Sequence, residues 1–423
     1  MEVKQIATLL NTVSDEVMGR DGDGNIKYMV NEDLTNIVDM GSAIFDSNSA
    51  DKYVAALVDH IGRVIFVNRV YRGVAPSVVR DAWEYGAVLQ KITVDTLPVA
   101  INNDDWGLVS GQSYDPFVFN PPAVSNKFYN KYVTFEIDLS YLRKQIRSAF
   151  DSPEQINAFL SMIFNSVEKS FTVKMDALVM RTINNMIAQI IMRDTIERSV
   201  AAGGTAPSAD TPNYVERPDF HNINGFTPQV VNLLTLYNAT LETPITSAQA
   251  IHDTGFLKYA AYTIGAYSDR MRMLNNMLNS GHKDRFTDAD NLKIVMLSDF
   301  ARAANVYLQS DTFHNEFTRF PVADLVPFWQ APNVESDPAI ATYDISAVST
   351  IDTTVEYEGH KIGVSTSYIL AAMFDRDALG VANLERETDS IYNPKGSFYN
   401  NFYKFRAGYF NDLNEQFVVF IAE

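Results

Sequence analysis

Apolar and polar residues follow helical spacing in some parts of this chain and strand-like alternation in others. At the N-terminus apolar residues recur every three or four positions, as on one face of a helix: Ile6, Leu9, Leu10, Val13 and Val17. Asp15 and Glu16 lie outside this stripe. The segment is too acidic and too interrupted for a signal peptide, so we expect an amphipathic helix of the folded protein.

The strongest helical pattern covers residues 168–199. One wide apolar stripe runs along it, formed by Met175, Leu178, Val179, Ile183, Met186, Ile187, Ile190 and Ile191. Just upstream, Ser152 is a suitable N-cap and Pro153 a suitable first helical residue. The pattern predicts a helix long enough to form the backbone of a flat molecule.

Strand-like patterns occur on both sides of this helical region. The segments 63–71, 86–101 and 127–139 are rich in β-branched and aromatic residues. The polar stretch 102–126 separates the last two of them, and we interpret 86–139 as a projecting β-hairpin arm. The tail from residue 368 onward is again β-rich.

A Gly-, Ala-, Pro- and Ser-rich stretch at 201–213 marks a domain boundary. The second unit, 215–375, is expected to mix helices at 227–238, 255–280 and 298–309 with strands at 292–297 and 353–364. Within it, Glu358 and Gly359 are expected at the turn of a hairpin.

Composition narrows the classes of function. The net charge of -18 opposes binding to a phosphate backbone, so the chain is not built to grip DNA, although it can surround it. There are no cysteines, which excludes disulfides and thiol catalysis. Aromatic residues make up 12% of the chain and favour large buried surfaces or interfaces. No apolar run is long enough to span a membrane.

Motifs for catalysis are missing from the sequence. It contains no G-x-S-x-G elbow, no phosphate-binding Walker loop and no H-E-x-x-H, and its six histidines are scattered. One metal pattern is present: Asp21, Asp23, Asn25 and Glu32 fit positions 1, 3, 5 and 12 of a calcium loop. Position 6 is Ile26 rather than Gly, so a solvated turn is the favoured interpretation and calcium the alternative.

Two clusters of charged residues also have a functional and a structural interpretation. Asp375 and Asp377 flank Arg376 and look like a catalytic carboxylate pair, but Gly380 follows closely and favours a strand end and a turn. The cluster Arg143, Lys144 and Arg147 lies on a predicted helix. In so acidic a chain, it is expected to contact another subunit or solvent rather than nucleic acid.

The segment 374–420 resembles the C-terminal part of major head proteins from small tailed phages. In those proteins, a strand ending in an Asp-containing turn leads to an N-P-x-G loop, then an aromatic strand and a last hydrophobic strand. The loop matches Asn393, Pro394, Lys395 and Gly396, and the closing strand matches Phe417 to Phe420. Residues 56–70 are similar to the segment that enters the extended loop of these proteins. The resemblance implies a tailed-bacteriophage major capsid protein, most like those of small podoviruses, with the α+β Hong-Kong-97-type capsid fold.

The same resemblance implies a division into parts and a set of contacts. The parts are an N-terminal arm (1–62), a strand plus extended loop (63–139), a peripheral domain with a spine helix (140–214), an axial domain (215–375) and the C-terminal β part of the peripheral domain (376–423). Trp83, Trp106 and Phe117 are expected to anchor the extended loop on an adjacent subunit. The loop at 391–397, which contains Asn393, Pro394, Lys395 and Gly396, is expected to meet other copies near local three-fold axes.

The implied function is self-assembly, through hexamers and pentamers, into an icosahedral head shell around the double-stranded DNA genome, assembled in the host cytoplasm and present in the virion. The expected partners are other copies of the chain, a separate scaffolding protein and a portal. DNA is enclosed without sequence-specific binding, and neither a cofactor, a membrane nor an enzymatic activity is expected.

Three alternatives stay open from the sequence. An encapsulin-like nanocompartment shares the fold and would hold a cargo protein. A soluble two-domain enzyme with a site assembled from distant residues would form a small oligomer and no shells. A calcium-dependent adhesion or tail-fibre protein would lose its fold when calcium is chelated.

Overall fold

A computed structural model describes residues 3–47, 49–50, 52–57, 60, 73–80, 89–96, 110–111, 117, 119–201, 229–311, 323–330, 345–357 and 359–423. The strand predicted at 63–71 lies outside the described residues, as does nearly all of the predicted break at 201–213.

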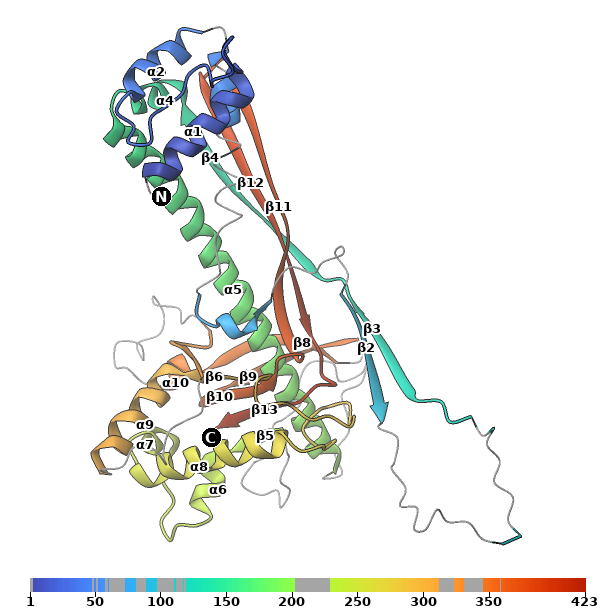
Figure 1. Ribbon diagram of the computed structural model, residues 1–423. Helices are drawn as coiled ribbons and strands as arrows, with labels where there is room; N and C mark the ends of the chain where they lie inside the picture. The colour runs from blue at the N-terminus through green and yellow to red at the C-terminus, as the bar shows by residue number, and fades with distance from the viewer. Residues whose placement is uncertain are drawn as a thin grey trace.

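The helix α5, Pro153–Ala201, runs through most of the length of the molecule (Figure 1). Its 49 residues span about 70 Å at 1.5 Å per residue. The predicted N-cap is confirmed, because the backbone N–H of Gln155 donates to Ser152 Oγ at 3.2 Å. The helix expected at 168–199 is therefore the second part of one continuous helix that already begins at Pro153.

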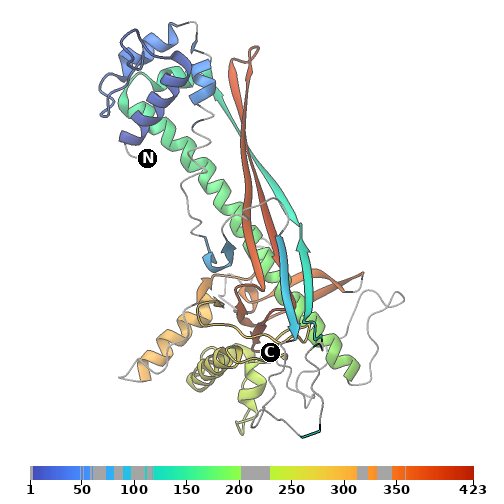
Figure 2. The ribbon, with the colours of Figure 1, turned by 45° about the vertical axis from the view of Figure 1, so that its right-hand side comes forward.

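A long four-stranded sheet lies beside α5 (Figures 1 and 2). Its strands, in spatial order, are β1 (Val79–Arg80), β11 (Leu379–Asn393), β12 (Phe398–Asn411) and β4 (Tyr132–Leu142). Burial alternates along β12 because one face meets α5 and the other meets solvent. On the inner face the Phe405 and Phe171 rings meet edge to face with centroids 4.7 Å apart, which joins sheet and helix.

Three shorter helices lie around the N-terminal end of α5, near the N-terminus of the chain (Figure 1). They are α1 (Val3–Met18), α2 (Ile37–Phe45) and α4 (Arg143–Ala149). The predicted apolar stripe of α1 is confirmed, since Ile6, Leu10 and Val13 are fully buried. They form one core with residues of α5 and with Tyr399 and Tyr403 of β12.

The opposite end of α5 carries a second, five-stranded sheet (Figure 1). Its order is β5 (Val230–Asn232), β13 (Phe417–Ile421), β10 (Ile369–Asp375), β6 (Leu292–Leu297) and β7 (Asp324–Val326). Every residue of β10 and β13 is buried, as expected for central strands covered on both faces. The helices around this sheet are α6 (Leu233–Asn238), α7 (Ser247–Ala250), α8 (Thr254–Met271), α9 (Ser298–Asp311) and α10 (Ile345–Val348).

Two of the helix predictions in this unit were wrong at their ends. The helix expected at 255–280 ends at Met271, because the side-chain amide of Asn275 folds back and donates to the carbonyls of Arg270 and Met273. The helix expected at 227–238 begins only at Leu233, since Val230–Asn232 pairs with β13 as a strand. The strand predicted at 292–297 is confirmed as β6.

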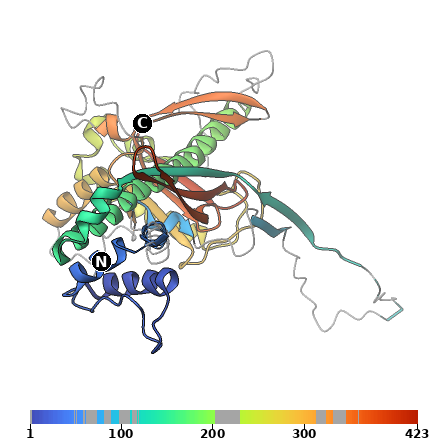
Figure 3. The same ribbon diagram turned by 90° about the horizontal axis from the view of Figure 1, so that it is seen from above.

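Two β-hairpins lie outside the two large sheets. The first, β8 (Ile351–Tyr357) and β9 (His360–Thr366), lies against α5. It confirms the predicted turn, where Gly359 adopts a φ of 83° that suits glycine. The second, β2 (Leu89–Thr96) and β3 (Ala123–Tyr129), projects sideways (Figure 3). The 3-10 helix η1 (Pro76–Val78) directly precedes β1.

Candidate assembly surfaces

The β2–β3 hairpin has one apolar and one polar face, and the apolar face is turned outward. Opposite residues in its ladder share a face, and faces alternate along each strand. The outer face carries four apolar side chains that are substantially exposed: Ile92, Val94, Val124 and Phe128. Ile92 is 65% exposed and Phe128 is 62% exposed. Such a face in a folded protein indicates a surface that another molecule covers.

The inner face of the same hairpin is held to the body by ion pairs. Lys91 Nζ lies 2.9 Å from Asp412 Oδ2 and 2.7 Å from Glu415 Oε1. Lys127 Nζ, from the opposite position on β3, lies 2.8 Å from Asp412 Oδ1. Asp412 is 2% exposed and Glu415 is 7% exposed, so both carboxylates are buried in the turn between β12 and β13. We call these four residues the hairpin cradle.

A second set of polar contacts holds the outer end of the hairpin. Asp95 on β2 pairs with Lys283 at 2.9 Å, and its backbone carbonyl accepts from the N–H of Asp284 at 3.2 Å. Arg285 Nη1 donates to the carbonyl of Val94 at 2.7 Å, while its Nε lies 3.3 Å from Glu415 Oε1. The loop before β6 thus connects the hairpin to the cradle.

The two buried carboxylates respond differently to their surroundings. Burial works against ionisation of Asp412, but Lys91 and Lys127 outweigh it and lower the pKa of Asp412 to about 2. Burial raises the pKa of Glu415, and the opposing effect of Lys91 and Arg285 does not cancel the rise. Asp412 is therefore the residue that carries the negative charge of the cradle over the widest pH range.

The turn between β11 and β12 forms the far tip of the long sheet. Asn393 Oδ1 accepts from the backbone N–H groups of Lys395 and Gly396 at 3.1 and 3.2 Å, which closes the predicted N-P-x-G loop. The N–H of Arg143 donates to the carbonyl of Ser397 at 3.0 Å, which ties the loop to the start of α4. The basic cluster predicted from the sequence therefore lies next to this tip. Ile391, just before the loop, is exposed.

The contacts predicted for Trp83, Trp106 and Phe117 stay predictions. Phe117 is 89% exposed, whereas Trp83 and Trp106 lie outside the described residues. The cradle residues and the outward apolar side chains of the hairpin were not singled out from the sequence. The sequence does carry a signal for the two faces of the hairpin, namely the alternation of Ile92 and Val94 with Lys91 and Asp95.

The carboxylates that resembled a catalytic pair form a turn. Asp375 Oδ1 accepts from the N–H of Asp377 at 2.7 Å, and Asp377 Oδ1 accepts from Arg80 Nη2 at 3.0 Å. Burial raises the pKa of Asp375. This geometry fits the structural interpretation, in which the pair closes the connection between β10 and β11.

The residues of the calcium pattern occupy an exposed loop after α1. Asp21 Oδ1 accepts from the N–H groups of Asp23 and Asn25 at 3.0 and 2.9 Å, and Glu32 pairs with Lys4 at 3.1 Å. In the part of the chain that the structure describes, no three His, Asp or Glu side chains are grouped to hold a metal ion. Calcium binding stays a prediction.

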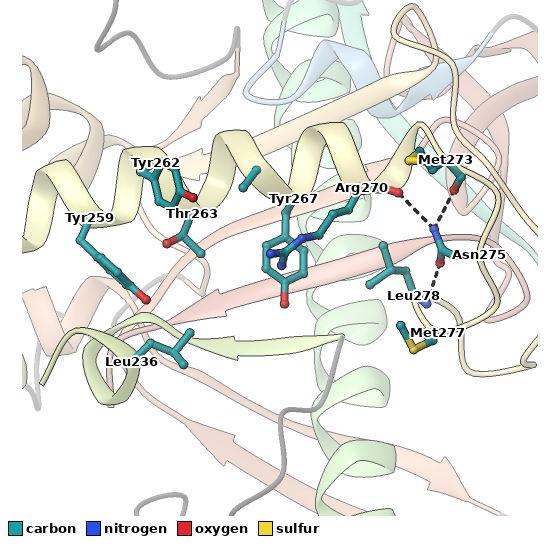
Figure 4. Close-up of a pocket in the computed structure, with 11 residues that line it drawn as sticks. Leu236, Tyr259, Tyr262, Thr263, Tyr267, Arg270, Met273, Asn275, Met277 and Leu278 are labelled. Carbon is teal, nitrogen blue, oxygen red and sulfur yellow. Dashed lines mark hydrogen bonds between the residues drawn. The ribbon is translucent and has the colours of Figure 1, made fainter. Parts of the chain in front are cut away.

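A further surface feature lies on α8 and the segment that follows it. A cavity of about 480 Å³ opens between the side chains of Tyr259, Tyr267 and Arg270 on the helix and those of Met277 and Leu278 (Figure 4). The guanidinium carbon of Arg270 lies 4.8 Å from the centre of the Tyr267 ring. This groove is mainly apolar and belongs to the five-stranded end of the molecule.

The described helices include none that is both long and apolar enough to cross a membrane.

Comparison with protein families gives one decisive result: residues 16–421 match the model of the Phi29-like phage major capsid protein family. The chain belongs to this family. It is accordingly a phage major capsid protein, a structural component of the virion shell.

Solved capsid structures resemble this capsid protein at low sequence identity. A chain of the Staphylococcus phage Andhra capsid aligns over 82% of this chain and 83% of its own, with 9% identity and a TM-score of 0.42. A chain of the Cyanophage P-SCSP1u capsid aligns over 84% of this chain and 88% of its own, with 9% identity and a TM-score of 0.40. No curated protein matches in sequence.

The structure confirms the mixed α+β fold class predicted from the sequence, since both sheets are packed with helices. The match runs from within α1 to the end of β13, so it includes both large sheets and both hairpins.

Proposed function

We propose that this capsid protein assembles by laying the outward face of its β2–β3 hairpin on a neighbouring copy. The observation that carries the proposal is the inverted polarity of that hairpin, whose charged side chains face its own subunit while Ile92, Val94, Val124 and Phe128 face away. A shell is made of copies of one chain, so the natural cover for this face is another copy. Burying the exposed parts of four such side chains contributes roughly 2–6 kcal/mol per contact.

The parts of the chain then take the following roles. Residues 1–62 form the N-terminal arm, 63–139 the strand and extended loop, 140–214 the spine-helix part of a peripheral domain, and 215–375 an axial domain. Residues 376–423 serve both domains, because β11 and β12 belong to the long sheet and β13 to the five-stranded one. The tip from Asn393 to Gly396 is exposed and lies beside a basic helix, which supports a contact with acidic surfaces of other copies near local three-fold axes.

The wider assembly follows from the same reasoning. Repeated heterologous contacts close into pentamers and hexamers of a shell, with a scaffolding protein and a portal as further partners. The net charge of -18 supports enclosure of DNA without sequence-specific binding. The role is mechanical and not enzymatic.

A pair of matched variants tests the hairpin contact. Ile92→Ser with Phe128→Ser removes apolar surface from the outward face, and Val173→Ser is the control because Val173 is equally exposed on α5. We expect the double variant to keep the thermal stability of the unassembled subunit but to form no closed shells by electron microscopy and sedimentation. Normal shells from the double variant would contradict the proposal.

A further inference from the structure

The attachment of the β2–β3 hairpin to its own subunit is made largely of charges. Lys91 and Lys127 from the hairpin meet Asp412 and Glu415 of the body, and Asp95 of the hairpin meets Lys283. The described aromatic contact is at the base, where the rings of Tyr129 and Phe410 have centroids 5.2 Å apart. Among the described residues, β2 and β3 pair only with each other, so side chains and a few backbone bonds hold the hairpin to the body.

A charged attachment of this kind is specific in geometry, and its net free energy is much smaller than the attraction between the charges alone. The attraction between Lys91 and the buried carboxylates is offset by the loss of hydration that all of these groups suffer. When the hairpin leaves, the lysines and carboxylates regain water. An apolar attachment would have no such compensation, because exposed apolar surface stays unfavourable in water.

We propose that the hairpin is a releasable arm, held on its own subunit by an electrostatic latch of Lys91, Lys127, Asp412 and Glu415 until a neighbouring copy covers its outward face. That a neighbouring copy covers the outward face rests on the proposed function. The latch itself is a property of the single subunit. It gives the arm one defined position before assembly and lets it move at low cost during assembly.

The structure also places the pivot of this movement. Tyr129, the last residue of β3, is followed after two residues by Tyr132, which begins β4 and pairs with Gly408 in the long sheet. The N–H of Tyr409 donates to the carbonyl of Lys131 at 3.2 Å, which fixes the connection between the strands. The base of the hairpin is thus anchored at this end, while its other end, at Thr96 and Ala123, is held by the contacts of Asp95 and Arg285.

The turn that carries Asp412 and Glu415 is held by hydrogen bonds of its own within the body. The N–H of Asp412 donates to the carbonyl of Ala378 at 2.6 Å, and Asp412 Oδ1 accepts from the N–H of Asn414 at 3.1 Å. Just beyond, the N–H of Phe417 donates to the carbonyl of Leu278 at 2.9 Å. These bonds lie entirely within the body, so opening the latch need not unfold β13.

Hydrogen exchange on the unassembled subunit tests the latch directly. Lys91→Met with Lys127→Met removes both hairpin cations, and Lys404→Met is the matched control because Lys404 pairs with Asp389 at 2.9 Å on an exposed face of the sheet. A two-stranded hairpin is only marginally stable alone, so we expect peptides covering 89–96 and 123–129 to exchange at least about 10-fold faster in the double variant. Exchange in β10 and β13 should not change, and the control should match the original protein.

Two outcomes would overturn the latch. Unchanged exchange in the hairpin would mean that the ion pairs do not hold it, and an equal rise in β10 and β13 would mean that the network belongs to the core. If the double variant does not fold, Lys127→Met serves instead: it removes only the pair between Lys127 and Asp412, and about 3-fold faster exchange is expected in the hairpin alone. Because no assembly is involved, a failure here is separate from a failure of the Ile92 and Phe128 variants to block shell formation.

Discussion

Asp412→Asn is the most informative single substitution in this capsid protein. The carboxylate is almost fully buried and accepts charge-assisted bonds from Lys91 and Lys127 at 2.9 and 2.8 Å. Asparagine has nearly the same shape but no charge. The substitution therefore leaves the turn sterically intact and deprives both lysines of one anionic partner.

The size of the effect follows from the pKa of Asp412. A fall from the ordinary 3.8 to about 2 corresponds to roughly 2 kcal/mol of stabilisation by the ionised form. Because the pKa is lowered in the folded state, this stabilisation is present above the unfolded pKa and is lost as the pH falls from about 4 toward 2. Glu415 acts in the opposite sense, since its raised pKa makes protonation favour the folded state.

Urea unfolding of the unassembled subunit at a series of pH values measures this difference. We expect Asp412→Asn to lower the free energy of unfolding by roughly 2 kcal/mol at pH 7 and by progressively less below pH 4. Asp412 is one cause of the raised pKa of Glu415, so both proteins also carry Glu415→Gln in a second series, and the difference between them then reports Asp412 alone. A difference that stays constant down to pH 2, or that grows on acidification, would refute the assignment of the stabilisation to the ionised carboxylate.

Two further substitutions test the fold. Phe405→Ala removes a buried ring that meets Phe171 and should lower the free energy of unfolding by roughly 3–5 kcal/mol in urea melts, whereas Phe119→Ala, at an exposed position, should leave it unchanged; equal effects would disprove the sheet–helix contact. Gly359→Ala forces a side chain into a φ of 83° and should cost roughly 1–2 kcal/mol in the same assay; a neutral result would mean that the hairpin turn relaxes freely.

Local patterns in the sequence were reliable where one face of an element is buried. The N-terminal helix, the strand β6, the hairpin turn at Gly359 and the cap at Ser152 all follow from side-chain spacing and backbone preference, and the structure confirms them. The helix expected at 255–280 failed at its end because the stop signal is a side-chain bond from Asn275, a residue that is common in both helices and loops.

Local side-chain patterns could not predict which distant segments pair in the sheets. Strand β13 inserts between β5 and β10, which places residues 417–421 beside 230–232 in a parallel pair. The periodicity of a short apolar strand does not specify its partner, because any other buried strand could form the same backbone hydrogen bonds with it. The family resemblance of the C-terminal segment predicted the fold class for a different reason, namely the order of turn, loop and strands along the chain.

The β2–β3 hairpin shows that the pattern of apolar and polar residues does not always predict which face of a strand is buried in its own chain. The alternation of Ile92 and Val94 with Lys91 and Asp95 predicts a strand with two unlike faces, and the usual rule turns the apolar face toward the core of the same chain. Here the rule is reversed, because the buried carboxylates of the 412–415 turn provide partners for the lysines and leave the apolar face outside. In the proposed contact a neighbouring copy covers the apolar face, so the polarity rule holds for the assembled shell rather than for the single chain.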